Sequence, residues 1–190
     1  MLQIYENEII IGVLVVAVLV IISRLYTRST KERAFVRTGW GGQKVVMDGG
    51  ALVLPVLHDI SYVNMNTFRL EVSRKEDESL ITKDQMRVDV DVAFYVRVRP
   101  NRESIADAAQ TLGTRTLEPS KLQELIEDKF IDALRATAAM MTKQQLQDDR
   151  PCFVQGVWNA VAEDLMKNGL EIESISLTKL QSVCGSVASG

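Results

Sequence analysis

Fourteen consecutive residues near the N-terminus, Ile9 to Ile22, carry no polar side chain. As an α-helix this run would extend about 21 Å, and the wider segment from Ile4 to Tyr26 about 34 Å, against about 30 Å for the hydrocarbon core of a bilayer. A helix packed inside a globular domain would show a polar stripe, which this run lacks. We therefore predict a single transmembrane helix over residues 9–26. The membrane-anchoring residues are expected to include Ile9, Val13, Val16, Leu19 and Ile22.

The charges around the apolar run predict its orientation. A cleaved signal peptide would begin with basic residues, whereas residues 1–8 contain Glu6 and Glu8 and no basic side chain. The basic residues follow the run instead, at Arg24, Arg28, Lys31, Arg33 and Arg37. By the positive-inside rule, residues 1–8 lie outside and the rest of the chain lies in the cytoplasm. These basic residues are also candidates for contacting lipid headgroups, although setting topology is the simpler role for any one of them.

Composition excludes several functional classes. The net charge is −3, which disfavours a domain built to wrap nucleic acid. Cys152 and Cys184 have no second thiol or histidine near them at the spacing of metal ligands. Two such isolated cysteines fit a reducing compartment. We predict neither a metal site nor a cofactor.

Strand patterns dominate the first half of the domain, which we expect over residues 34–180 after a basic linker at 27–33. Short strands are expected at Ala34–Arg37, Gln43–Met47, Leu52–Leu54, Ile60–Val63 and Phe68–Val72. The clearest strand is Met86–Arg99, where apolar and polar residues alternate through seven repeats. Its apolar face is expected to pack on the core.

The polar face of that strand is a candidate interface between copies of the chain. It carries charges of both signs, namely Arg87, Asp89, Asp91, Arg97 and Arg99. Such a face can pair head to tail with a neighbouring copy in a ring. A sheet face that simply meets water is the simpler alternative.

Three helices with apolar stripes are expected after this strand, over residues 101–113, 120–141 and 151–168. The N-cap signals are Asn101 and two capping boxes, Ser120 with Gln123 and Thr142 with Gln145. A strand at Leu170–Leu177 and a disordered tail at 181–190 complete the chain. Strands followed by helices predict an α+β fold, with a curved antiparallel sheet and helices packed on one side.

The sequence shows no catalytic constellation. The only histidine, His58, is followed by Asp59, but adjacent residues in an extended segment point apart, and no nucleophile accompanies them. His58 is therefore expected in a loop or turn, and no catalytic residue or enzymatic activity is predicted. Trp158 lies on an apolar helix stripe and is expected in the core. Trp40 lies in a turn near the predicted span, where it is a candidate for the membrane interface.

Longer segments carry a resemblance to a known family. They are AFVRTGWGGQKVVMDGGALVLPVLHDI, NMNTFRLEVSR, LITKDQMRVDVDVAFYVRV, AAQTLGTRTL, EDKFIDALRATAAMMT and FVQGVWNAVAEDLMKNGLEIESISLT. Together with the N-terminal span, they resemble the SPFH (stomatin/prohibitin/flotillin/HflK-HflC) or Band 7 family, and in particular its flotillin-like members of the bacterial inner membrane. The resemblance covers residues 34–178.

The resemblance implies a function that the residue pattern does not show. It implies a non-enzymatic scaffold that forms homo-oligomeric rings or cages, organises membrane microdomains and associates with NfeD-like membrane proteins. Two alternatives stay open, a regulatory subunit of a membrane protease complex and, with less support, a membrane-tethered hydrolase. Flotillin-like chains continue into long Glu/Ala-rich helices, so this chain is expected to be truncated before a C-terminal coiled coil.

Overall fold

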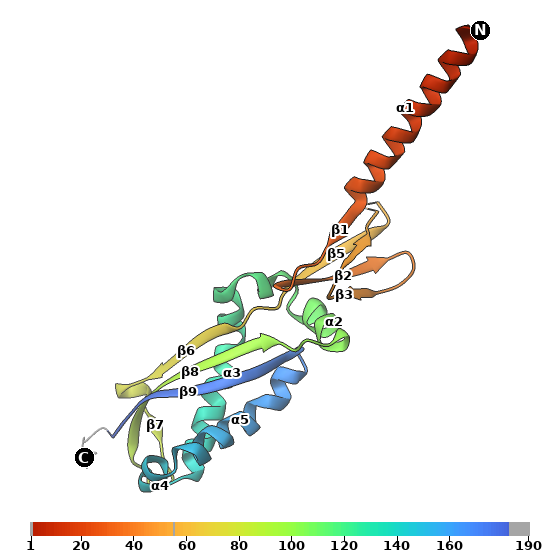
Figure 1. The fold of residues 1–190 in the computed structure, drawn as a ribbon. Coiled ribbons are helices and arrows are strands. Elements are labelled where there is room, and N and C mark those ends of the chain that lie inside the picture. The colour runs from red at the N-terminus through yellow and green to blue at the C-terminus, as the bar shows by residue number, and fades with distance from the viewer. Residues whose placement is uncertain (1, 55, 183–190) are drawn as a thin grey trace.

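The computed structural model describes residues 2–54 and 56–182, and the side chains of 11–54 and 56–181. The helices are α1 (Leu2–Leu25), α2 (Arg102–Thr111), α3 (Pro119–Met140), α4 (Lys143–Asp148) and α5 (Arg150–Met166), with short 3-10 segments at η1 (Glu76–Glu78) and η2 (Gly113–Leu117). The strands are β1 (Tyr26–Arg28), β2 (Arg33–Gly39), β3 (Lys44–Val46), β4 (Gly50–Leu52), β5 (His58–Asn64), β6 (Phe68–Arg74), β7 (Leu80–Ile81), β8 (Arg87–Val98) and β9 (Leu170–Ser182). Helix α1 projects from one end of the molecule, and β9 ends near the other (Figure 1).

The α+β class is as predicted, but the strands form three antiparallel sheets rather than one curved sheet. β1 pairs with β4, β2 lies between β3 and β5, and β8 lies between β9 on one edge and β6 with β7 on the other. The break between the second and third sheets has a local cause. The side chain of Asn64 accepts a hydrogen bond from the amide of Asn66 at 3.0 Å, a turn that ends β5 before β6 begins.

The main core lies between the third sheet and two helices. α3 and α5 cover one face of this sheet (Figure 1). The alternation predicted for β8 is confirmed, because its inward side chains Val88, Val90, Val92, Phe94, Val96 and Val98 are all buried. The rings of Phe94 and Phe130 stack with centroids 4.1 Å apart. Met86, which was expected on the core face, precedes β8 and is exposed.

Two of the three predicted helix caps are present. Asn101 accepts a hydrogen bond from the amide of Ser104 at 2.6 Å, and Thr142 forms a reciprocal capping box with Gln145. The box predicted at Ser120 is wrong. α3 starts one residue earlier, at Pro119, where a missing N–H costs nothing because the first helical amides have no partner inside the helix.

Several strands differ from the prediction. β1 was not predicted because its residues were assigned to the end of the apolar segment and to the basic linker, and β7 was not predicted because two residues carry no measurable periodicity. β9 continues past Leu177 to Ser182, and the remainder of the predicted tail, 183–190, lies outside the described residues. His58 is the first residue of β5, paired with Gly39, and not a loop residue as predicted. Trp158 packs against the core but is only partly buried.

Candidate functional site

The described part of α1 presents apolar side chains to its surroundings. The large apolar side chains from Ile11 to Ile22 are between 44% and 65% exposed. Of the predicted anchoring residues, Val13, Val16, Leu19 and Ile22 belong to this set, whereas the side chain of Ile9 lies outside the described residues. Within the part of the chain that was described, no helix has the length and apolarity required to cross a membrane.

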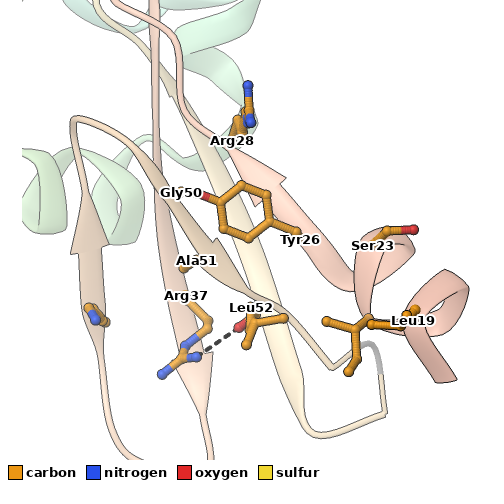
Figure 2. A pocket seen from close by; sticks show the side chains of 10 residues that line it. Leu19, Ser23, Tyr26, Arg28, Arg37, Gly50, Ala51 and Leu52 are labelled. Atoms are coloured by element: carbon orange, nitrogen blue, oxygen red, sulfur yellow. Dashed lines mark hydrogen bonds between the residues drawn. The ribbon is translucent and has the colours of Figure 1, made fainter. Parts of the chain in front are cut away.

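An open cleft of about 900 Å³ lies where α1 meets the first two sheets (Figure 2). It is lined by Leu19, Ile22, Ser23, Tyr26, Arg28, Arg37, Lys44, Gly50, Ala51 and Leu52. Two of the five predicted headgroup residues, Arg28 and Arg37, therefore share one cavity. The other three, Arg24, Lys31 and Arg33, do not line it.

The three cations that line the cleft, Arg28, Arg37 and Lys44, come from β1, β2 and β3 and have different surroundings. Arg37 Nη1 donates to the carbonyl oxygen of Leu52 at 2.9 Å, and Arg37 Nε is buried without a hydrogen-bond partner among the described residues. Lys44 lies directly opposite Arg37 in the β2–β3 register. The guanidinium carbon of Arg28 lies 5.6 Å from the centroid of the Tyr26 ring. Within the part of the chain whose side chains are described, no acidic side chain lines the cleft and none of the three cations forms an ion pair.

Apolar side chains also stand exposed on two neighbouring loops. Trp40 is 78% exposed in the turn after β2, and Val56 is 94% exposed in the loop before β5. The two loops contact each other, because the amide of Trp40 donates to the carbonyl oxygen of Leu57 at 3.3 Å and the ring of His58 hydrogen-bonds the Trp40 carbonyl. His58 thus connects two loops, and no nucleophile stands among its hydrogen-bond partners in the described structure.

The polar face of β8 points away from the helices, and most of its charges are paired within the chain. Asp91 accepts from the hydroxyl of Ser73 at 2.6 Å and forms an ion pair with Lys75 at 2.9 Å. Glu171 on β9 contacts two β8-side guanidinium groups, Arg97 Nε at 2.7 Å and Arg99 Nε at 3.1 Å.

The two remaining residues of this face differ from each other. Asp89 accepts a hydrogen bond from Ser79, whereas Arg87 is exposed and forms no ion pair among the described residues. The five charged residues predicted as an interface therefore lie on one face of the sheet. Four of them already form hydrogen bonds or ion pairs within the chain, with partners on β6, on β9 and in the connections on either side of η1.

Asp84 and Asp91 are two of the three aspartates among the described residues whose pKa lies below the ordinary value of 3.8; the pKa of the third, Asp164, is lowered chiefly by its hydrogen bond with Lys167. The pKa of Asp91 is lowered by the hydrogen bond from Ser73 and then by Lys75. The pKa of Asp84 is lowered chiefly by the hydrogen bond from Thr82. Both are exposed or half-buried and lie in separate places, so they do not form an acid–base pair. Among the described residues no cluster of His, Cys, Asp and Glu is arranged to hold a metal ion.

Comparison with known proteins decides the family. Residues 27–182 match the sequence profile of the SPFH domain / Band 7 family, which is most of the 190-residue chain. The chain belongs to the SPFH domain / Band 7 family. The resemblance drawn from the sequence segments is thereby confirmed.

Relatives of this SPFH-domain chain carry flotillin names. It is 67% identical over 159 residues to the "Flotillin family inner membrane protein YqiK" of Escherichia coli (strain K12), an alignment that covers 84% of this chain and 29% of that protein. It is 30% identical over 172 residues to the "Flotillin family inner membrane protein sll1021" of Synechocystis, covering 88% and 26%. It is 25% identical over 134 residues to human "Flotillin-1", covering 70% and 30%. The chain spans less than a third of the length of these relatives.

Two features of this SPFH domain were not predicted from the sequence, namely the position of Lys44 in the cleft and the exposure of Val56. Lys44 joins the cationic cleft because the β2–β3 hairpin sets it opposite Arg37. The short glycine-containing connection between the predicted strands Ala34–Arg37 and Gln43–Met47 is a sequence signal for this pairing, since turn length sets strand register. The exposure of Val56 had no sequence signal, because a lone apolar residue in a loop is compatible with either burial or exposure.

Proposed function

We propose that this chain is the membrane-proximal module of a flotillin-like scaffold, anchored by α1 in a bacterial inner membrane. One observation carries the proposal. The apolar side chains of α1 are exposed on a helix that projects away from the domain (Figure 1). A contiguous exposed apolar surface of this kind requires a cover, and a bilayer would provide it all around the helix.

Two further features support a membrane beside this end of the domain. The cationic cleft adjoins the C-terminal end of α1, where basic side chains would meet lipid headgroups. The exposed Trp40 has the amphipathic ring that is favoured at membrane–water interfaces. In the proposed topology the N-terminus lies outside and the SPFH domain lies in the cytoplasm, because the basic residues follow α1.

The anchor is tested by placing charge in the apolar run. Replacing Val15 and Val16 with arginine costs about 2.5–3.5 kcal/mol per residue at the centre of a membrane helix. We expect the double variant to leave membranes during a carbonate wash, while wild type stays. Ile81→Arg with Met140→Arg is the control, because both side chains are exposed and far along the chain from α1. Retention of the Val15/Val16 variant would refute anchoring by α1.

The orientation is tested separately with reporters fused after residue 180. A reporter that works only in the cytoplasm is expected to be active, and one that works only in the periplasm is expected to be silent. The opposite pattern would place the domain on the other side of the membrane.

We further propose that the module assembles into homo-oligomers through the open polar face of β8. Support comes from the mixture of charges on that face and from its position on the side of the sheet that the helices leave uncovered (Figure 1). Because exposed ion pairs contribute only about 0–1 kcal/mol each, a single charge change should do little. Reversing Asp89 and Asp91 to lysine together should oppose the contact by facing like charges across it.

The assembly experiment measures the mass of the solubilised complex at low and high salt. It should use both this chain and a version with the full length of its flotillin-family relatives, of which this chain spans less than a third. Asp128→Lys with Asp132→Lys on the exposed side of α3 is the matched control. Because Asp91 also holds Ser73 and Lys75, unfolding of each variant is measured in parallel. If the folded Asp89/Asp91 variant forms oligomers of the same mass as wild type, the polar face of β8 is not the interface between copies. If the longer version is monomeric under every condition, the proposed scaffold function is wrong. Association with an NfeD-like membrane protein stays a prediction, and co-purification of such a protein with this one would test it.

A further inference from the structure

We propose that the cleft between α1 and the first two sheets binds the headgroup phosphate of an anionic phospholipid. The inference rests on the proposed membrane anchoring by α1 and goes beyond it. If basic residues near the end of α1 only attracted anionic lipid by their charge, each of them would contribute equally to lipid binding. The structure instead separates Arg28, Arg37 and Lys44, which line one cavity, from Arg24, Lys31 and Arg33, which do not.

The cleft contains two positive charges that repel each other. Arg37 and Lys44 stand directly opposite each other in the β2–β3 ladder, an arrangement that destabilises a strand pair because like charges repel. Among the residues that the structure describes, no acidic side chain lines the cleft to offset this repulsion. An anion bound between the two cations would remove the penalty.

The side chain of Arg37 is held in place and partly buried. One of its nitrogens, Nη1, is held by the Leu52 carbonyl oxygen at 2.9 Å (Figure 2), which fixes the guanidinium plane. Its Nε is buried, so water is excluded from part of the group and its attraction for an anion is screened less than at an open surface. A guanidinium with a fixed plane is the side chain best suited to phosphate oxygens.

The cleft has both apolar and cationic lining. Leu19 and Ile22 of α1 contribute apolar side chains, and Arg28, Arg37 and Lys44 contribute cations from β1, β2 and β3. A phospholipid has the matching division, with acyl chains that would continue along the apolar surface of α1. Free inorganic phosphate would use the cations and leave the apolar wall unused.

The ring of Tyr26 helps to shape the site. It lies against Gly50, where a methyl group added to the glycine would fall 2.6 Å from the ring carbon Cζ. The same ring lies beneath the Arg28 guanidinium. A side chain at position 50 would therefore displace Tyr26 and, with it, Arg28.

The experiment uses native mass spectrometry of the full chain in mild detergent, with phosphatidylglycerol or phosphatidylcholine added. We expect one phosphatidylglycerol to be retained per chain, with a preference over phosphatidylcholine of about tenfold or more, as for hydrogen bonds to charged groups. Arg37→Gln with Lys44→Gln should abolish the preference. Lys31→Gln with Arg33→Gln removes the same charge from the same region and should keep it.

A single substitution at Lys44 tests the same site with less risk that the variant fails to fold. Lys44 is exposed, so Lys44→Gln should fold, weaken retention of phosphatidylglycerol, and leave the unfolding midpoint equal to or above that of wild type, because the repulsion from Arg37 is gone. A lower midpoint together with unchanged retention would overturn the proposal.

Three other results would also overturn it: equal retention of the two lipids, equal loss in the Lys31/Arg33 control, or displacement of the lipid by inorganic phosphate at a matching concentration. Because these measurements are made in detergent, they are independent of the carbonate wash that tests α1. Loss of membrane anchoring would refute the proposed function, whereas loss of lipid preference alone would refute only this site.

Discussion

His58 Nε2 lies 3.0 Å from the carbonyl oxygen of Trp40, so the imidazole connects two loops that are 18 residues apart. Its other nitrogen, Nδ1, accepts a hydrogen bond from the amide of Leu54 at 3.2 Å. An accepting Nδ1 requires the proton of a neutral ring to be on Nε2, where it is donated to Trp40. The only histidine of the chain therefore acts as a brace for the loops that expose Trp40 and Val56.

Replacing His58 with alanine should loosen these loops without removing any catalytic group. Losing two hydrogen bonds is expected to lower the free energy of unfolding by about 1–3 kcal/mol. Urea unfolding measures this change. In a Trp158→Phe background, fluorescence anisotropy of Trp40 should fall as well. Asp59→Ala serves as the neighbouring control, and equal effects of the two changes would rule out a bracing role for His58.

Gly39 and Gly42 should respond very differently to alanine. Both have positive φ, 128° and 82°, which costs an alanine about 1–2 kcal/mol. A Cβ on Gly39 would also fall 2.2 Å from the carbonyl oxygen of Leu57, whereas nothing lies within 4 Å of one on Gly42. We expect Gly42→Ala to lose about 1 kcal/mol and Gly39→Ala about 3 kcal/mol or more by denaturant unfolding. If the two variants lose the same free energy of unfolding, the backbones at Gly39 and Leu57 can move apart without loss of stability, and the predicted clash is wrong.

Protonation of Asp91 should contribute to acid unfolding. Its pKa is lowered in the folded state by Ser73 and Lys75, so its stabilising contribution is fully present above the ordinary value of 3.8. The contribution is lost as the pH falls below that value through the folded-state pKa. Asp91→Asn should therefore flatten the dependence of unfolding free energy on pH in the acid range and leave its slope near neutrality unchanged. An unchanged acid slope in unfolding titrations would contradict this assignment.

The pair formed by Glu171 and Arg97 should couple more strongly than a fully exposed pair. The side chains are 22% and 40% exposed, and Glu171 also holds Arg99. A double-mutant cycle with alanine should give a coupling energy of about 0.5–1 kcal/mol, reduced by salt. The matched cycle on Arg69 and Glu71, which are 58% and 65% exposed, should give nearly zero. Equal coupling in the two cycles would show that burial does not set the strength of these pairs.

Elements whose pattern is local could be predicted from the sequence. β8 was predicted because valine or phenylalanine recurs at every second position from Val88 to Val98, as expected for a strand with one buried face. The caps at Asn101 and Thr142 were predicted because each cap depends on a hydrogen bond between a side chain and an amide only three residues away. The failed box at Ser120 shows the limit of such signals, since Pro119 starts α3 without it.

By itself the sequence determined the apolar run of α1, the two-sided character of β8, the amphipathic helices and the family. Each of these depends on residues close together in the chain. The three-dimensional arrangement was needed to show that the strands divide into three sheets, that His58 connects two loops, and that the Arg37–Lys44 pair lies in a cleft beside α1. These relationships arise when segments far apart in sequence pair in one register, and the free energy that selects the register comes from burial and hydrogen bonding across the whole domain.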